Sequence, residues 1–466
     1  MIKVYFPEEK IPYYVYEALQ IFGTVENLVT LIPSYTKLML QLINDDGDIL
    51  RTDLITDETR KAIKRQVYIV MTQYTGYESP WGCMTGIRPA KTVNQLERDG
   101  LNNAEVLEYL LDVYKIREDK ARLAIETAAT QADANMLTGE RSSSIGFYAG
   151  VPFCPTRCLY CSFTSNPIEK YYKSVDKYID LIGQEIKETA ALIKEHNLSI
   201  ESLYIGGGTP TSLNEAQLQS YLNHLTDNLD LSRLAEFCLE AGRPDSINEE
   251  KLRISINAGV NRISINPQTM NDITLEAIGR CHTSEQTVKA FYQAREAGFN
   301  NINMDIIAGL PGEDERMFEY TLEQINKLQP DSLTVHTLSI KRAAMLRFDA
   351  DALEKLSFSV TSNMVDMARA FATSLGLRPY YMYRQKNMLG NLENVAYCRK
   401  GCESPYNIHI MEEDQTILAV GAGAVTKVVY SNNRIERAFN VKSVEDYLRR
   451  MPEMIERKRL LLDNNI

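Results

Sequence analysis

Six short β-rich runs, each followed by turn residues and a longer helical run, occupy the middle of this 466-residue chain. The runs are residues 145–150, 201–207, 235–241, 261–266, 301–310 and 331–340. Amphipathic stretches such as 175–196 and 285–298 lie between them, with apolar residues three and four positions apart. This alternation is typical of parallel strands joined by crossover helices. It predicts an α/β fold, a partial (β/α)6 barrel, with its chemistry at the carboxyl ends of the strands.

The two flanks of this repeat have different patterns. The N-terminal flank begins with a β-rich run, has a hairpin signal around residues 44–48 and continues as helices, which predicts a small α+β domain of unknown role. The C-terminal flank is mixed, with a helical pattern at 359–376, a Gly-rich run at 421–424 and a charged terminal helix. We expect this extension to cover the barrel and its substrate site. The predicted domains are residues 1–140, 141–345 and 346–466.

The composition fits a folded protein with a sizeable core, because 44% of the residues are hydrophobic. No run approaches the roughly eighteen apolar residues that span a bilayer, and the N-terminus lacks the apolar core of a signal peptide. We therefore expect a cytoplasmic protein, and a monomer. A net charge of -11 argues against a nucleic-acid partner, since phosphate contacts need a basic face.

Three of the eight cysteines stand close together in the segment CPTRCLYC, directly after the first β-rich run. In the reducing cytoplasm such a group favours metal binding over disulfides. Structural zinc sites close four ligands, often as two CxxC pairs, and the sequence has no second pair. Cys154, Cys158 and Cys161 can instead hold three irons of a 4Fe-4S cluster and leave the fourth iron open for a cofactor. Zinc with a distant Cys or His remains the alternative.

A second motif, YIGGGTPT at residues 204–211, follows the second β-rich run. Glycines let the backbone approach a ligand closely, although three glycines alone often mark only a turn. Together the two motifs resemble those of the radical S-adenosylmethionine (SAM) enzymes. WGCMTGIRP at 81–89 and YRQKNMLGNLENVAY at 383–397 narrow the resemblance to the oxygen-independent coproporphyrinogen III dehydrogenases (oxidases), in the HemZ-type branch.

The resemblance implies one 4Fe-4S cluster on the three cysteines and one or two molecules of SAM. Tyr148 would lie by the first SAM, and Tyr160 would face the second. Glu240 would bind the first SAM from the end of the third strand, and Asp305 would be a ribose-type ligand. The implied cofactor contacts in full are Tyr148, Tyr160, Gly207, Gly208, Thr209, Glu240, Gln268, Arg280, Asp305, Ser339 and Val425.

Each of these residues also has a purely structural interpretation. Tyr148 could pack in the core, Glu240 and Asp305 could be solvated strand ends, and Arg280 could form a surface ion pair. Their recurrence at successive strand ends favours the functional interpretation, because ligands of barrel enzymes come from several strands.

The chemistry implied by the resemblance is an oxidative decarboxylation. A reduced cluster gives one electron to SAM, and the resulting 5'-deoxyadenosyl radical removes hydrogen from a propionate of coproporphyrinogen III. Carbon dioxide is lost, and two such reactions yield protoporphyrinogen IX. The implied partners are this tetrapyrrole and a flavodoxin- or ferredoxin-type electron donor. Candidate cations for the substrate carboxylates, with solvated surface charge as the alternative, are Lys341, Arg342, Arg384 and Lys386.

The sequence departs from the family pattern at two places. Phe163 stands where well-characterised members carry a further cysteine, which is not a cluster ligand. Glu393 stands where haem-chaperone relatives carry the histidine of their HNxxYW motif, which makes haem delivery less favoured. Cys398 is a conceivable thiolate ligand, with an inert buried cysteine as the alternative. The alternative functions are a haem-binding chaperone and a radical SAM enzyme that methylates or opens a haem ring.

Overall fold

The protein is described here by a computed structural model, which gives two compact units. The first unit comprises residues 1–126, 384–386 and 390–392, and the second comprises 127–383, 387–389 and 393–466. The residues whose structure is described are 2–6, 13–22, 29–33, 38–43, 48–55, 59–86, 88–134, 143–163, 165–341, 343–385, 388–430 and 434–463.

The first unit combines a four-stranded sheet with helices, as the sequence predicted for this flank. The order in the sheet is β2-β1-β3-β4, with β1 and β2 parallel and the other pairs antiparallel. The β3–β4 pair is the hairpin predicted around residues 44–48, although 44–47 lie outside the described residues. Its elements are β1 (Ile2–Phe6), α1 (Tyr13–Gln20), β2 (Val29–Pro33), β3 (Leu38–Ile43), β4 (Ile49–Ile55), α2 (Arg60–Thr75), α3 (Pro89–Arg98), α4 (Asn103–Asp112) and the start of α5 (Glu118–Asp133).

Arg384 and Trp81 connect distant parts of the sequence within this first unit. The Trp81 side chain is fully buried, and the Arg384 guanidinium carbon lies 5.3 Å from the centre of its ring. Arg384 also donates hydrogen bonds to the carbonyl oxygens of Met84 and Asn391. A short C-terminal segment is thereby fixed on the N-terminal unit, which the separate domains predicted from sequence did not include.

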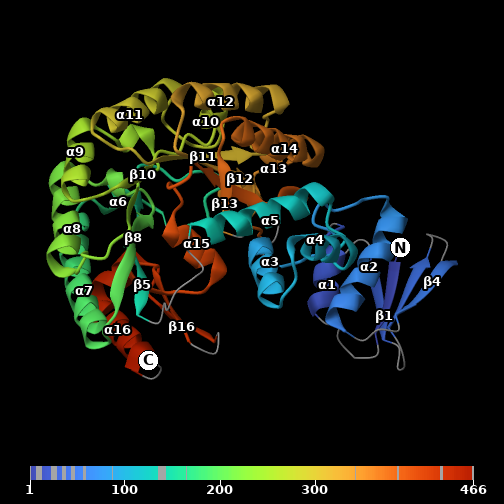
Figure 1. Cartoon of the computed structure of the whole chain (residues 1–466). Coiled ribbons are helices and arrows are strands. Elements are labelled where there is room, and N and C mark those ends of the chain that lie inside the picture. Colours follow the sequence, from blue (N-terminus) through green and yellow to red (C-terminus); the bar gives the residue numbers. More distant parts are fainter. Residues whose placement is uncertain are drawn as a thin grey trace. The chain divides into compact units, whose positions relative to one another are not determined.

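The second unit contains the six predicted parallel strands, which pair in the order in which they occur in the chain. They are β5 (Ser144–Val151), β8 (Ser199–Gly207), β9 (Glu236–Glu240), β10 (Arg262–Ser264), β11 (Ile302–Ala308) and β12 (Ser332–Thr337). The crossover helices lie along the outside of the strands in Figure 1. They are α7 (Val175–Glu195), α8 (Glu215–Asn228), α9 (Glu249–Asn257), α10 (Asp272–Ala277), α11 (Ser284–Glu296) and α12 (Glu315–Leu328). The predicted α/β partial barrel is therefore confirmed.

The C-terminal segment extends this same sheet at both edges, giving eleven strands. β14 pairs antiparallel with β12, whereas β15 pairs parallel with β5 at the opposite edge. The added strands are β13 (Arg378–Tyr383), β14 (Asn394–Cys398), β15 (Thr416–Val420), β16 (Val425–Val429) and β17 (Ile435–Phe439). The remaining elements are β6 (Phe153–Cys154), β7 (Asn166–Pro167), α6 (Ile168–Tyr171), α13 (Ala350–Glu354), α14 (Phe358–Ser374), α15 (Pro405–Glu412) and α16 (Val444–Asp463).

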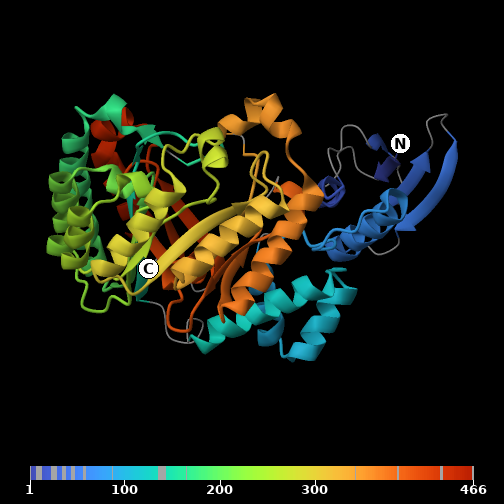
Figure 2. The same ribbon diagram turned by 90° about the horizontal axis from the view of Figure 1, so that it is seen from above.

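The Gly-rich run at 421–424 is a tight turn between β15 and β16. Gly421 has φ +100°, and a Cβ there would lie 2.6 Å from the Gly150 carbonyl oxygen, so no larger residue fits. Its N–H donates to the buried carboxylate of Glu185 on α7, 2.8 Å away. Glu185 also pairs with Lys458 of α16 at 2.5 Å, and Figure 2 shows α16 in red beside α7 in green.

Among the residues that the structure describes, none of the helices combines the length and the apolar character that crossing a membrane requires.

Candidate functional site

The three predicted cluster ligands lie on one loop that follows β5. Cys154 is buried on the short strand β6, and the Thr209 hydroxyl donates to its Sγ over 3.5 Å. Cys158 and Cys161 are partly exposed and are joined by a backbone hydrogen bond of 3.2 Å from the Cys161 N–H. Burial raises the pKa of the Cys154 thiol to about 11, and burial also raises that of Cys161. Without a metal, the Cys154 and Cys161 thiols are protonated at neutral pH.

Hydrogen bonds fix this loop to the segment that follows β10. The Leu159 N–H donates to the Ile278 carbonyl oxygen at 2.9 Å, and the Thr156 hydroxyl donates to the Gly279 carbonyl oxygen at 3.1 Å. On the other side, the Leu346 N–H donates to the Leu159 carbonyl oxygen at 2.9 Å. The cysteine loop is thus supported by segments that follow two further strands of the barrel.

The glycines after β8 allow the backbone to pass close to the cysteine strand. Gly207 has φ +111°, a conformation that favours glycine. A Cβ on Gly208 would lie 2.4 Å from the Phe153 carbonyl oxygen and 2.9 Å from Cys154 Sγ. The Thr209 N–H then donates to that Phe153 oxygen at 2.6 Å. The sequence predicted close approach to a ligand, and the structure adds a close approach to the strand that carries Cys154.

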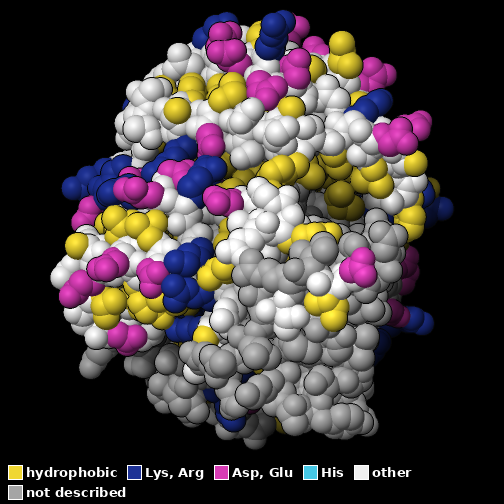
Figure 3. All heavy atoms as spheres, turned by 90° about the vertical axis from the view of Figure 1, so that its right-hand side faces the viewer, with side chains coloured by type: hydrophobic (Ala, Val, Ile, Leu, Met, Phe, Trp, Pro, Cys, Tyr) yellow, Lys and Arg dark blue, Asp and Glu magenta, His cyan; other side chains and the backbone are white. Residues whose placement is uncertain are grey.

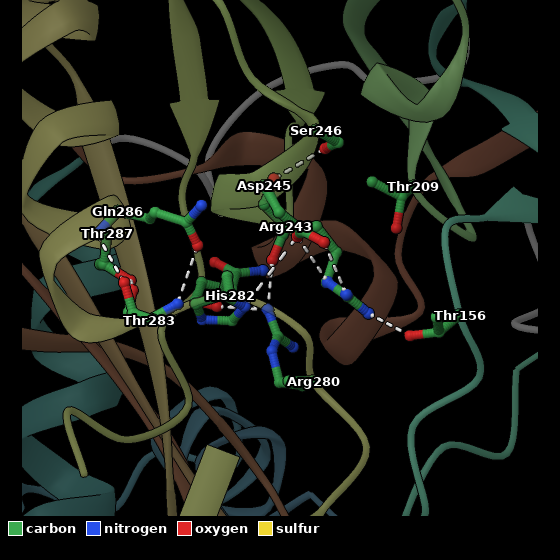
Figure 4. Close-up of polar contacts among 12 residues, drawn as sticks. Thr156, Thr209, Arg243, Asp245, Ser246, Arg280, His282, Thr283, Gln286 and Thr287 are labelled. Carbon is green, nitrogen blue, oxygen red and sulfur yellow. Dashed lines mark hydrogen bonds and ion pairs between the residues drawn. The ribbon is translucent and has the colours of Figure 1, made fainter. Parts of the chain in front are cut away.

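Arg243 contacts the cysteine loop from the segment after β9 (Figure 4). Its Nη1 donates to the Thr156 hydroxyl at 3.0 Å and lies 3.9 Å from Cys158 Sγ. Its Nε and Nη2 donate to the two carboxylate oxygens of Asp245 at 2.9 Å and 2.8 Å. The Arg243 side chain is only 3% exposed. Sequence analysis did not single out Arg243 or Asp245, although their position directly after a strand was a signal.

Tyr160, which follows Leu159 in the cysteine loop, is joined to Arg280. Arg280 Nη1 donates to the Tyr160 hydroxyl at 3.1 Å, and Nη2 donates to the carbonyl oxygens of Gly242 and Asn266 at 2.7 Å and 2.6 Å. Burial raises the pKa of Tyr160, which is therefore a neutral phenol. The structure thus brings these two predicted residues together, and Arg280 is buried, which disagrees with the alternative of a surface ion pair.

The carboxylates predicted at the ends of the third and fifth strands form a partly buried polar group with their neighbours. The Tyr204 hydroxyl donates to Glu240, and the Asn266 amide donates to the other Glu240 oxygen at 3.2 Å. Burial and the nearby Asp305 carboxylate raise the pKa of Glu240 to about 7. Burial alone would raise the pKa of Asp305, but the interaction with His336, at 3.5 Å, outweighs it and lowers the pKa. Neither carboxylate is a freely solvated strand end.

Tyr148 lies on β5, where its ring stacks against other tyrosines. Its ring centre is 6.4 Å from that of Tyr204 and 6.3 Å from that of Tyr406, and these two rings are 4.4 Å apart. Burial raises the pKa of Tyr148 well above its usual range. These contacts fit the packing interpretation of Tyr148, and its role beside a cofactor stays a prediction.

The other predicted contacts are spread over the carboxyl end of the sheet and its extension. Gln268 has φ +66°, and its side-chain oxygen is buried and accepts no hydrogen bond from the residues that the structure describes. Ser339 lies just beyond β12, where it forms an isolated bridge with Met388. Val425 is 36% exposed at the start of β16, where it pairs with Phe439. Gln268 therefore has an oxygen free to accept from a ligand, while the roles of Ser339 and Val425 stay predictions.

The residues present fit an iron-sulfur cluster. Three thiols share one loop, the missing side chain of Gly208 leaves room beside Cys154, and the Arg243 guanidinium lies against Cys158. In the described part of the chain, no three Cys, His, Asp or Glu side chains converge on a point where one metal ion would fit. A 4Fe-4S cluster has a different requirement, because each thiolate binds a different iron.

Comparisons with known proteins give the family. Residues 148–325 match the model of the radical SAM superfamily. The chain is 38% identical over 412 residues to the oxygen-independent coproporphyrinogen-III oxidase-like protein HemZ of Bacillus subtilis, covering 87% of this chain and 82% of the relative. The chain belongs to this family of coproporphyrinogen oxidase-like radical SAM proteins. Membership in the superfamily implies a 4Fe-4S cluster and SAM as cofactors.

Two further relatives show how wide this radical SAM family is. The heme chaperone HemW of Bacillus subtilis is 31% identical over 278 residues, covering 59% of this chain and 69% of the relative. The solved structure of the Escherichia coli coproporphyrinogen III oxidase HemN matches with a TM-score of 0.54 and 24% identity, over 70% of this chain and 73% of that chain. The HemN likeness supports the fold, and the HemW likeness means that family membership alone does not fix the reaction.

The side chains that the sequence suggested as cations for substrate carboxylates lie in different surroundings. Lys341 Nζ lies 5.6 Å from the ring centre of Phe163, beside the cysteine loop. Arg384 has the buried position in the first unit described above, and Arg342 and Lys386 lie outside the described residues. Lys and Arg side chains also gather in places on the face shown in Figure 3, among Asp and Glu side chains. The net negative charge is therefore compatible with local cationic sites.

Phe163 and Glu393, the two predicted departures from the family pattern, differ in their exposure to solvent. Phe163 is 68% exposed, whereas Glu393 is buried, as is the nearby Cys398. Burial raises the pKa of Cys398 far above its usual range, so its thiol is not a ready metal ligand. Cys398 packs with Tyr380 and Ile408, in agreement with an inert buried cysteine.

Proposed function

We propose that this protein is a radical SAM enzyme that converts coproporphyrinogen III to protoporphyrinogen IX by oxidative decarboxylation of two propionates. The main support is the match to the coproporphyrinogen-III oxidase-like protein HemZ over 87% of the chain. The proposal also rests on the site, where the cysteine loop meets polar residues from the ends of several strands.

Cys154, Cys158 and Cys161 would hold the cluster, which would supply the electron that cleaves SAM and would thereby provide a 5'-deoxyadenosyl radical. In the overall change, the β-carbon of a propionate loses a hydrogen atom, which ends in 5'-deoxyadenosine. The neighbouring carboxylate leaves as carbon dioxide, one electron passes to an external one-electron acceptor, and a vinyl group remains. Two such turnovers consume two SAM molecules and release two molecules each of methionine and 5'-deoxyadenosine.

In this proposal, residues of the chain bind and orient the cofactor and the substrate. Asp305 is held ionised by His336 and accepts hydrogen bonds from the ribose hydroxyls of SAM, while Glu240 and the free oxygen of Gln268 accept donors from the same cofactor. Arg280 keeps Tyr160 in place at the cysteine loop. Lys341 is the described candidate cation for a substrate carboxylate beside that loop. We also propose a cytoplasmic monomer that receives its electrons from a flavodoxin- or ferredoxin-type donor.

A haem-chaperone function is the second candidate, because the HemW relatives are up to 31% identical to this chain. Glu393 stands in place of the chaperone histidine, and its side chain is only 1% exposed on the segment leading into β14. A buried carboxylate at this position is a poor haem ligand. These observations favour the decarboxylation.

The deciding experiment supplies the anaerobically reconstituted chain with SAM, a reductant and coproporphyrinogen III, and in parallel with haem. We expect mass analysis to show loss of two carbon dioxide molecules from coproporphyrinogen III and no change in haem. Unchanged coproporphyrinogen III together with normal cleavage of SAM would overturn the proposal. Stoichiometric haem binding without decarboxylation would support the chaperone, and a methylated or opened haem would support the third class of relatives.

A further inference from the structure

Arg243 is a buried cation whose three nitrogens have two different kinds of partner. Nε and Nη2 form a bidentate ion pair with Asp245, and Nη1 points the other way, to the Thr156 hydroxyl and to Cys158 Sγ at 3.9 Å. In Figure 4, Arg243 extends from Asp245 towards Thr156. The guanidinium therefore lies between the carboxylate and the cysteine loop, with its positive side towards the thiol.

We propose that Arg243 is a positioning residue that holds the Cys158 thiolate and raises the reduction potential of the cluster. Asp245 orients the guanidinium, and Thr156 connects it to the loop. This inference rests on the cluster that the radical SAM family implies and is independent of the tetrapyrrole reaction.

The physical reason is the charge that the cluster gains on reduction. Three thiolates already make the cluster site negative, and reduction adds one more negative charge. A fixed cation in a buried environment stabilises the more negative state most, and hydrogen bonds to the cluster sulfurs act in the same direction. Because the Asp245 oxygens lie behind the guanidinium as seen from Cys158, they weaken this effect without reversing it.

No other cation competes for Asp245 among the contacts that the structure gives it. His282 Nδ1 lies 4.0 Å from Asp245, but burial, followed by repulsion from Arg280, lowers the pKa of His282 to about 3. The imidazole is therefore neutral at pH 7, and Arg243 provides the positive charge. A buried ion pair contributes little net stability, which makes a role in folding alone an incomplete explanation of this pair.

The test is a redox titration of the anaerobically reconstituted full-length chain, followed by the electron paramagnetic resonance signal of the reduced cluster, without SAM or substrate. In Arg243→Gln, we expect the ratio of reduced to oxidised cluster at a fixed applied potential to fall about tenfold, equivalent to about 59 mV for a one-electron couple. The double variant Arg243→Gln with Asp245→Asn removes both buried charges and should shift in the same direction. It serves as the informative variant if the single one does not fold.

Arg253→Gln is the matched control. Arg253 lies on α9 and also forms a two-point ion pair, with Glu250, but its side chain is 63% exposed. We expect its potential to equal that of the unchanged chain. A full iron content with an unchanged potential in both Arg243 variants would overturn the inference, as would an equal shift in the control. A shifted potential in a chain that leaves coproporphyrinogen III unchanged would keep this inference and reject only the proposed function.

Discussion

The two ends of the parallel strands both carry buried arginines, and these arginines serve different partners. At the amino end, Arg262 donates to Asn301, Ser332 and the carbonyl oxygen of Cys402, at 2.8 to 3.1 Å, and pairs with Glu236 at 3.7 Å. At the carboxyl end, Arg243 leaves one nitrogen directed at a thiol. Arg262 thus binds only groups of the protein among the contacts given above, whereas Arg243 also contacts a cysteine that is a predicted cluster ligand.

The comparison indicates that, in a barrel of this kind, residues at the amino ends of the strands contribute to stability and residues at the carboxyl ends contribute to chemistry. A cavity of about 460 Å³ also opens at the amino end, but the strand-end residues of the predicted site lie at the carboxyl end. Variants at the amino end should therefore change the free energy of unfolding, and variants at the carboxyl end should change cofactor chemistry first.

The largest effect is expected for Cys158→Ala at the carboxyl end. Loss of one of three thiolates should reduce the iron content from about four atoms per chain to a small fraction of that and abolish SAM cleavage. Iron analysis and detection of 5'-deoxyadenosine provide the measurements. Cys281→Ala, which changes an exposed cysteine close enough to Arg243 to interact with it electrostatically, should retain both properties. Full iron in Cys158→Ala would reject the cluster assignment.

Arg262→Met at the amino end should destabilise the fold by about 3–5 kcal/mol, because Glu236 would remain as an uncompensated buried charge. Denaturant unfolding of the reconstituted protein measures this loss. Adding Glu236→Gln to the same variant should recover part of the stability. If Arg262→Met were as stable as the unchanged chain, the contrast between the two ends would fail.

Glu240→Gln should change the pH dependence of stability at the carboxyl end. The pKa of Glu240 is raised to about 7, so the folded form favours the protonated carboxyl. Its stabilising contribution is complete below the unfolded pKa, near 4.5, and is lost as pH rises through 7. We expect a loss on the order of 2 kcal/mol between these pH values in the cofactor-free chain, and a flatter profile in Glu240→Gln. Identical profiles for the two proteins would contradict the raised pKa.

Phe163→Ser should have the smallest effect, because the ring is 68% exposed. We expect a change in the free energy of unfolding within about 0.5 kcal/mol and an unaltered iron content. Thermal unfolding and iron analysis check both values. A loss of iron would show that this position helps to hold the cluster.

The fold of the barrel could be predicted from sequence because each strand carries its own local signal. The six β-rich runs became β5 and β8 to β12, in chain order. The five strands that extend the sheet were not predicted, since pairing such as that of β15 with β5 depends on contacts between residues distant in the chain. Hydrophobic periodicity reports which face of a strand is buried and contains no information about its neighbour.

The site divides in the same way. The cysteines and the glycines form contiguous motifs, and it was these motifs together that indicated the resemblance to radical SAM enzymes. Arg243, Asp245 and His282 are ordinary charged or titratable residues in the sequence, where most of their kind are solvated. Their contacts with one another and with the cysteine loop form only when the ends of different strands come together in the fold. A local sequence pattern contains no information about such contacts. The proline between Arg243 and Asp245, directly after a predicted strand, was the signal available.

The C-terminal strands at both edges of the sheet also have a consequence for how the chain reaches this state. The side-chain amide of Gln415, the residue before β15, donates a hydrogen bond to the hydroxyl of Ser144, 271 residues earlier. Before β14 and β15 have been synthesised, β5 and β12 of a nascent chain are therefore open edges, to which another chain can add a strand. Such high contact order predicts slow folding, and a chain truncated after residue 345 should aggregate rather than fold as an independent barrel.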